Sequence, residues 1–148
     1  MVRRAPLAYF HPVARGAYQA IYAVYLVQED REVLRAYESR CALCRLGHPP
    51  LLDAAHILPD GHRRGEPVVP NGLAMCKIHH AAYDADIIGI RPDLVVEVRN
   101  DVLQEIDGPM LRHGLQEMHG SSISVPRSRR DHPDPTRLEE RYEQFRAA

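Results

Sequence analysis

Two spacings of apolar residues follow each other through the middle of this 148-residue chain. The short run LLDAAHIL, at 51–58, is followed by Pro-Asp-Gly, which predicts a strand that ends in a turn. A loop rich in glycine and proline occupies 61–72, and LAM at 73–75 predicts a second brief strand. From Lys77 to Asp86 the apolar positions recur instead at the spacing of one helix face. We therefore predict a ββα unit.

Less regular patterns flank this unit. YQAIYAVYLV, at 18–27, alternates well enough to predict one or two strands, with a helix as the alternative. EDREVLRAYESR, at 29–40, predicts a helix that ends just before Cys41. Downstream we expect strands at 87–90, 94–98 and 122–125, a helix at 108–120, and a C-terminal amphipathic helix that begins after an Asp134 N-cap.

Composition narrows the setting in which the chain works. Its apolar stretches are too short to span a bilayer and no secretory signal pattern is visible, so we expect a cytoplasmic protein that binds no membrane. The formal net charge of −1 does not indicate a nucleic-acid binder. Every basic residue except Lys77 is nevertheless an arginine, which suits phosphate contacts, and His62-Arg63-Arg64 is a local candidate for them, with a solvated loop as the alternative.

Three cysteines and a histidine repeat a metal-ligand spacing. Cys41 and Cys44 form a CxxC, and Cys76 and His79 repeat the two-residue gap at the start of the predicted helix. Zinc prefers thiolate and imidazole ligands in a tetrahedron, and an odd number of cysteines suits such a site better than disulfides. We predict one closed structural zinc site. Ordinary buried cysteines are the alternative reading, and His80 is an alternative ligand.

A second set of residues interleaves with this zinc pattern. His56, Asn71 and His80 occur in the order strand, loop, helix, and LLDAAHILPDG…EPVVPNGLAMCKIHHAAYDADIIGI resembles the HNH endonuclease family. The likeness is to the subgroup with an AAHI first strand and an NGL…CxxHH second half, which occurs in bacterial restriction-type nucleases. This resemblance implies a ββα-metal fold, in which a hairpin and a helix grip one divalent cation.

The resemblance also implies roles for these residues. His56 corresponds to the general base that takes a proton from water, and Asn71 either orients that base or lies at the metal. His80 corresponds to a helix-borne ligand of Mg²⁺ or another divalent cation. Many family members carry a metal-binding residue just before the base, where this chain has an alanine. Asp53 on the same strand and Asp84 on the helix are the candidate replacements.

These expectations describe an α+β protein with a ββα-metal (HNH) core and a structural zinc knuckle, flanked by extra helices and short strands. The predicted nuclease domain spans 29–148, with its core at 41–90 and a C-terminal helical tail at 109–148. Residues 1–28 are too few for a DNA-reading domain, so they are either a remnant of one or an extra layer on the core.

We predict a metal-dependent endonuclease that hydrolyses DNA phosphodiester bonds in restriction or defence. Its sequence specificity would come from the module itself, from a homodimer, or from a separate DNA-reading protein. The alternative is a zinc-stabilised nucleic-acid-binding or regulatory module without cleavage activity.

Overall fold

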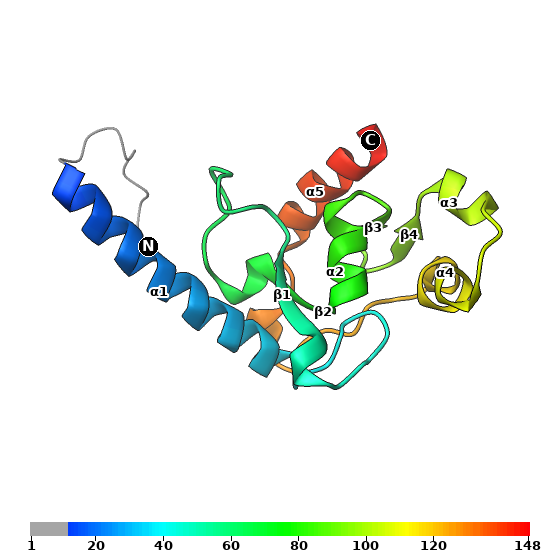
Figure 1. Cartoon of the computed structure of the whole chain (residues 1–148), viewed down its shortest axis with the longest axis horizontal. Helices are drawn as coiled ribbons and strands as arrows, with labels where there is room; N and C mark the ends of the chain where they lie inside the picture. The colour runs from blue at the N-terminus through cyan, green and yellow to red at the C-terminus, as the bar shows by residue number, and fades with distance from the viewer. Residues whose placement is uncertain (1–11) are drawn as a thin grey trace.

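The computed structural model describes residues 12–148, with side chains from residue 16 onward; residues 1–11 of the expected N-terminal extension lie outside this range. Figure 1 shows a long helix that projects from a body built by the remaining elements. In chain order the described helices and strands are α1 (Pro12–Ala36), β1 (Leu52–His56), β2 (Gly72–Cys76), α2 (Lys77–Asp84), β3 (Ile88–Ile90), β4 (Val96–Val98), α3 (Asn100–Gln104), α4 (Pro109–Gly114) and α5 (Pro135–Ala147). None of these helices combines the length and apolar character needed to cross a membrane.

The predicted ββα unit is confirmed. β1 and β2 pair antiparallel, from Leu52 opposite Cys76 to His56 opposite Gly72. Every residue of β2 is buried, whereas β1 leaves Asp53 and His56 partly exposed. α2 follows β2 without a gap, so the end of the hairpin and the start of the helix lie in one place.

The N-terminal region differs from the strand expectation, which was wrong. Residues 18–27 belong to α1, which continues unbroken to Ala36. Neither glycine nor proline occurs between 17 and 36, so nothing interrupts a helix once it has formed. The expected boundary between the N-terminal extension and the nuclease domain, after residue 28, falls inside α1. The helix ends before residue 40 because Glu38 and Ser39 adopt positive φ angles of 56° and 51°.

The contact between α1 and the hairpin is close. Val33 on α1 is fully buried, and a Cβ built on Gly72 would lie 2.4 Å from its Cγ2 atom. Glycine at position 72 therefore lets α1 lie directly against β2. Because Gly72 pairs with His56, this contact also sets which turn of α1 lies beside that histidine.

The C-terminal part confirms most of the expected elements. β3 and β4 pair as a second hairpin, whereas 122–125 contributes a single bridge, between Val95 and Ser122. The helix expected at 108–120 stops at Gly114 and resumes as a 3-10 turn at Gln116–Met118. α5 begins after the Asp134 N-cap, whose side chain accepts a hydrogen bond from the Thr136 amide.

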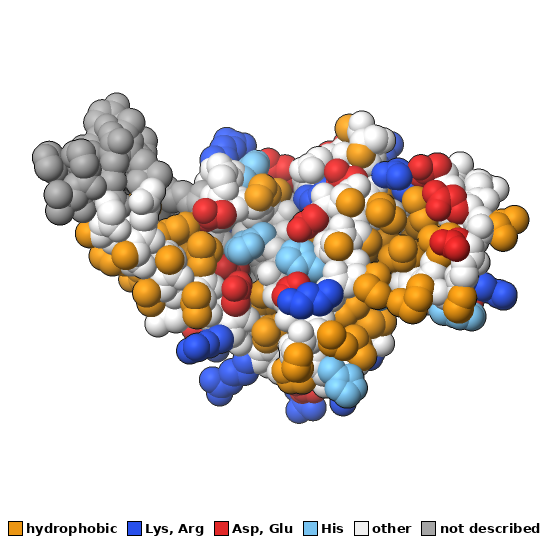
Figure 2. Space-filling view, in the orientation of Figure 1, with side chains coloured by type: hydrophobic (Ala, Val, Ile, Leu, Met, Phe, Trp, Pro, Cys, Tyr) orange, Lys and Arg blue, Asp and Glu red, His pale blue; other side chains and the backbone are white. Residues whose placement is uncertain are grey.

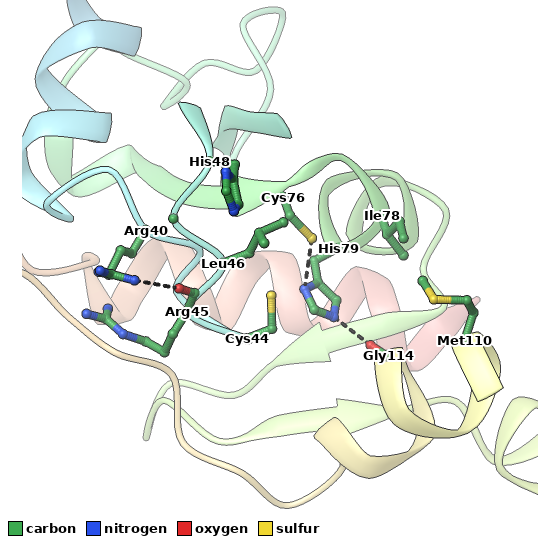
Figure 3. A pocket seen from close by; sticks show the side chains of 11 residues that line it. Arg40, Cys44, Arg45, Leu46, His48, Cys76, Ile78, His79, Met110 and Gly114 are labelled. Atoms are coloured by element: carbon green, nitrogen blue, oxygen red, sulfur yellow. Dashed lines mark hydrogen bonds between the residues drawn. The ribbon is translucent and has the colours of Figure 1, made fainter. Parts of the chain in front are cut away.

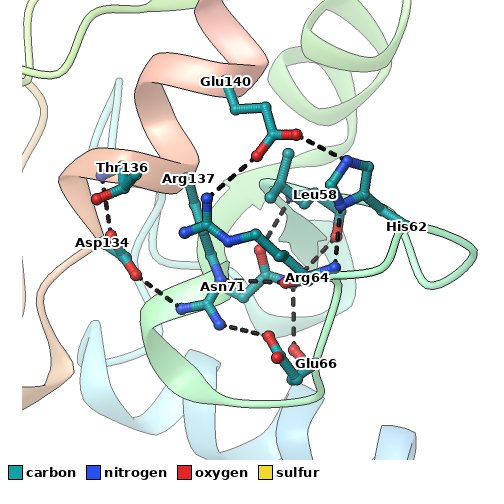
Figure 4. A network of polar contacts seen from close by, with 9 residues as sticks. All are labelled: Leu58, His62, Arg64, Glu66, Asn71, Asp134, Thr136, Arg137 and Glu140. Atoms are coloured by element: carbon teal, nitrogen blue, oxygen red, sulfur yellow. Dashed lines mark hydrogen bonds and ion pairs between the residues drawn. The ribbon is translucent and has the colours of Figure 1, made fainter. Parts of the chain in front are cut away.

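Polar contacts bind α5 to the rest of the molecule. Its buried Arg141 donates to the carboxylate of Asp86 and the backbone carbonyl of Tyr83, at the end of α2. Figure 4 shows the other contacts, which reach the loop at 59–71. Arg137 donates to Glu66, and both His62 and Arg64 contact Glu140.

The contact of Val33 with Gly72 yields a stability prediction. We expect Gly72→Ala to lower the free energy of unfolding by about 1–3 kcal/mol, because the new methyl group has no space beside a branched, buried side chain. Urea denaturation followed by circular dichroism measures the change. Gly61→Ala is the matched control, since a Cβ there meets nothing within 4 Å. Equal losses in both variants would contradict the proposed registration of α1.

Candidate functional site

The four predicted zinc ligands meet in the structure. Cys41 and Cys44 lie in a tight turn after α1, closed by hydrogen bonds from the Cys41 amide to Leu46 and from the Arg45 amide back to Cys41. Cys76 ends β2, and His79 lies in the first turn of α2. One ligand atom from each of the four residues lies within 4.8 Å of all the others.

The geometry of this cluster fits a tetrahedral ion. The Nδ1 atom of His79 lies 3.4 Å from the sulfur of Cys41 and 3.3 Å from that of Cys76. Ordinary zinc bond lengths imply a sulfur-to-nitrogen edge of about 3.6 Å. The other ring nitrogen, Nε2, lies 2.6 Å from the carbonyl oxygen of Gly114 and donates to it, which leaves Nδ1 free to bind a metal (Figure 3).

The thiols of the cluster differ in acidity. Burial works against ionisation of Cys41, but hydrogen bonds from His79 and from backbone amides outweigh it and lower its pKa to about 6. Burial raises the pKa of Cys44 to about 12, and the neighbouring Cys41 adds to this effect. Cys44 borders a cavity of about 570 Å³ whose lining includes Arg40 and Ile78. A soft cation bound to the cluster would remove the proton that Cys44 otherwise retains.

His56 is the last residue of β1 and lies where the hairpin contacts α1. Its Nε2 atom lies 2.9 Å from a carboxylate oxygen of Glu29, whose side chain is only 2% exposed. The hydrogen bond with Glu29 raises the pKa of His56 above its usual value, although burial of the ring opposes this. A carboxylate can only accept, so Nε2 carries the proton and Nδ1 is the nitrogen available as a base.

His80 contacts two carboxylates through its two ring nitrogens. Nδ1 lies 3.0 Å from Asp53, and Nε2 lies 3.2 Å from Asp84, one turn further along α2. Lys77 also contacts Asp53, at 2.5 Å. Partial burial works against ionisation of Asp53, but the hydrogen bonds from Lys77 and His80 hold its pKa below the usual value. The two candidate metal carboxylates therefore flank opposite edges of one imidazole.

We call these residues the acidic site: His56 and His80 with Glu29, Asp30, Asp53 and Asp84. Burial and the adjacent Glu29 raise the pKa of Asp30, whereas His56 and His80 act in the opposite direction. Figure 2 shows histidine side chains near the middle of one face, bordered by acidic ones. Among the side chains that the structure describes, only the Cys3His cluster already brings three or more metal-ligand groups close enough for an ion.

Asn71 lies apart from these groups. It is fully buried, its side-chain oxygen accepts from the Leu58 amide, and its side-chain nitrogen donates to the carbonyls of Leu58 and Glu66. Its own carbonyl accepts from the Ile57 amide. Asn71 therefore fixes the two residues that follow His56, and its side-chain hydrogen bonds go to the backbone of Leu58 and Glu66.

No pattern in the sequence indicated Glu29 as a site residue. Its position in a helical segment gave no sign of function, because the contact with His56 spans 27 residues and depends on where α1 crosses the hairpin. The structure limits the phosphate contacts suggested for residues 62–64. Glu140 contacts His62 and Arg64, whereas Arg63 is exposed.

Residues 41–91 match the family model of the HNH endonucleases. This segment, about a third of the chain, is similar to the HNH endonucleases. It includes both the Cys3His cluster and the three positions His56, Asn71 and His80, whereas Glu29 precedes it.

Similarity to a solved structure extends beyond the HNH segment. A structure described as a modification-dependent TagI restriction endonuclease matches with a TM-score of 0.56 and 22% sequence identity, over 79% of this chain. This chain spans 37% of the length of that one. At this identity the match shows a shared fold. No curated protein matches the chain.

The roles of the two adjacent histidines of α2 can be separated by mutation. We expect Cys41→Ser to lose bound zinc and to lower the free energy of unfolding by roughly 3 kcal/mol or more, because zinc binding and folding are coupled. His80→Ala should keep both its zinc and its fold. Zinc content and thermal unfolding measure both outcomes, and loss of zinc in both variants would contradict the division between His79 and His80.

Proposed function

We propose that this protein is a metal-dependent endonuclease that hydrolyses phosphodiester bonds of DNA, with His56 as the general base. The observation that carries the proposal is the pairing of His56 with Glu29 beside His80 and two further carboxylates, in a segment that matches the HNH endonucleases. Histidine bases and carboxylate-bound cations are a suitable combination for attack of water on a phosphate.

The charge of the acidic site supports dependence on a cation. Glu29, Asp53 and Asp84 bring three carboxyl groups to the acidic site, with Lys77 as the nearby ammonium that contacts one of them. A DNA phosphate approaching these groups would be repelled. Mg²⁺ commonly binds through one or two protein ligands together with substrate phosphates, so an open site with few protein ligands fits its chemistry.

His80 and Asp84 are the residues that we propose hold this cation. Asp53 is already neutralised by Lys77, and its oxygen lies closer to Nδ1 of His80 than Asp84 lies to Nε2. Asp53 therefore accepts a hydrogen bond from Nδ1, and this contact orients Nε2 toward Asp84. Histidine ligands commonly donate their second nitrogen to a carboxylate in this way. The bound cation would neutralise charge that develops on the phosphate.

The protein's own contribution is proton transfer and orientation. His56 takes a proton from water at Nδ1, the water oxygen bonds to phosphorus, and the bond from phosphorus to the leaving oxygen breaks. Asn71 keeps the backbone after His56 in place through its contacts with Leu58. The Cys3His cluster, which we propose holds zinc, fixes the start of α2 and with it His80.

Restriction or defence is the role that we propose for this nuclease. The similar solved structure is described as a modification-dependent restriction endonuclease, and it is much longer than this chain. The sequence specificity of such a nuclease would come from the module itself, from a homodimer, or from a separate DNA-reading protein. The competing function is a zinc-stabilised nucleic-acid-binding module, which would keep the fold without holding a catalytic cation.

Plasmid cleavage separates the two functions. We expect cutting in the presence of Mg²⁺ or Mn²⁺ that EDTA abolishes, and a loss of about 10²–10⁴-fold in rate for His56→Ala, because general-base catalysis contributes this much. Zinc content should not change. His113→Ala, an exposed histidine paired with Glu117, serves as the control and should cut normally. Absence of cutting by the wild type with any divalent metal would favour the binding module.

The carboxylate assignment has its own test. We expect Asp84→Asn to raise the Mg²⁺ concentration needed for half-maximal rate by more than about tenfold, because it removes a ligand. Asp53→Asn should have a smaller effect, since it alters only the orientation of His80. Titrating the cleavage rate with Mg²⁺ gives both values. The reverse order would assign the cation to Asp53.

A further inference from the structure

Glu29 is a buried acid that the HNH segment does not supply. It is 3% exposed, and the hydrogen bond that it makes among the described residues goes to Nε2 of His56. It belongs to α1, whereas the match to the family begins at residue 41. A buried carboxylate is rarely retained without a partner, so this contact calls for an explanation.

The fold fixes the position of Glu29 closely. Glu29 and Val33 are four residues apart on α1, so they lie on the same face of the helix. Val33 rests against Gly72, and Gly72 is the cross-strand partner of His56. A helix held at Gly72 by one side chain therefore presents the side chain one turn earlier to His56.

We propose that Glu29 is a positioning residue that holds His56 in the orientation and tautomer needed for a general base. This inference rests on the proposed nuclease function. Glu29 accepts a hydrogen bond from Nε2, so the lone pair of Nδ1 is available to receive the proton of the attacking water. That proton remains on the imidazolium while the new phosphorus–oxygen bond forms and the bond to the leaving oxygen breaks. The nearby carboxylate stabilises the imidazolium.

Other charged groups also surround His56, and they differ in strength. Glu29 has the largest effect and raises its pKa through the hydrogen bond; Asp30 of the same helix and Asp60 of the following loop add smaller effects in the same direction. From the hairpin and α2, Asp53 and His80 act on Asp30. Glu29 is the member of this set that contacts the ring.

The decisive variant is Glu29→Gln, which keeps the size and an acceptor oxygen but removes the charge. We expect kcat to fall by about 10–100-fold while KM stays within about twofold, because the change acts on the base and not on DNA binding. The acidic limb of the kcat/KM profile should move to lower pH by about one unit, because the imidazolium loses its stabilising charge. In the cation-free protein, NMR titration of the His56 ring should show the same shift.

A purely structural ion pair would give a different result. Glu29→Gln would then unfold more easily but would keep the kcat, the acidic limb and the ring titration of the wild type, and this outcome overturns the inference. Glu32→Gln is the matched control, since Glu32 is exposed one turn further along α1. It should resemble the wild type in every measurement.

Two further outcomes are distinguishable. If Glu29→Gln does not fold, Glu29→Asp keeps the charge but withdraws it by one methylene, and kcat should fall by about tenfold; an unchanged kcat overturns the inference. A wild-type protein that cuts no DNA with any divalent cation overturns the proposed function and this inference together. A wild type that cuts DNA alongside an undiminished Glu29→Gln overturns the inference alone.

Discussion

A carboxylate or carbonyl oxygen contacts at least one ring nitrogen of His56, His79 and His80, and the chemistry open to each histidine depends on which of its nitrogens carries the proton. A nitrogen that donates to such an oxygen carries the proton, so the opposite nitrogen alone can bind a metal or take up a proton. The acceptors are Gly114 for His79, Asp53 for His80 and Glu29 for His56. Glu29 on α1 and Gly114 on α4 lie outside the ββα unit, so the surrounding fold helps to specify the chemistry of that unit.

The short helix α2 joins the two sites. His79 and His80 are adjacent, and successive side chains on a helix point about 100° apart. His79 is buried against the cysteines, while His80 is partly exposed beside the carboxylates. The Cys3His cluster fixes the N-terminal end of α2, and Arg141 of α5 holds its C-terminal end. The helix can therefore present the second histidine in a defined direction.

The features that the sequence predicted correctly depend on the spacing of residues that are close together in the chain. The two CxxC-like pairs and the strand, loop and helix around His56 and His80 depend on residues close in the chain, and the structure brings them together as expected. Glu29 depends on how α1 crosses the hairpin, which no local pattern encodes. The same limit explains the wrong strand at 18–27, because alternating apolar residues on a projecting helix remain exposed there, as Ile21 and Val24 do.

Long-range ¹⁵N correlation NMR of the histidine rings, in the zinc-loaded and magnesium-free protein above the pKa of His56, tests the division of nitrogens most directly. We predict a proton on Nε2 of both His56 and His79, a metal on Nδ1 of His79, and a proton on Nδ1 of His80. A proton on Nδ1 of His56, or a zinc bound to His80 in place of His79, would contradict this division.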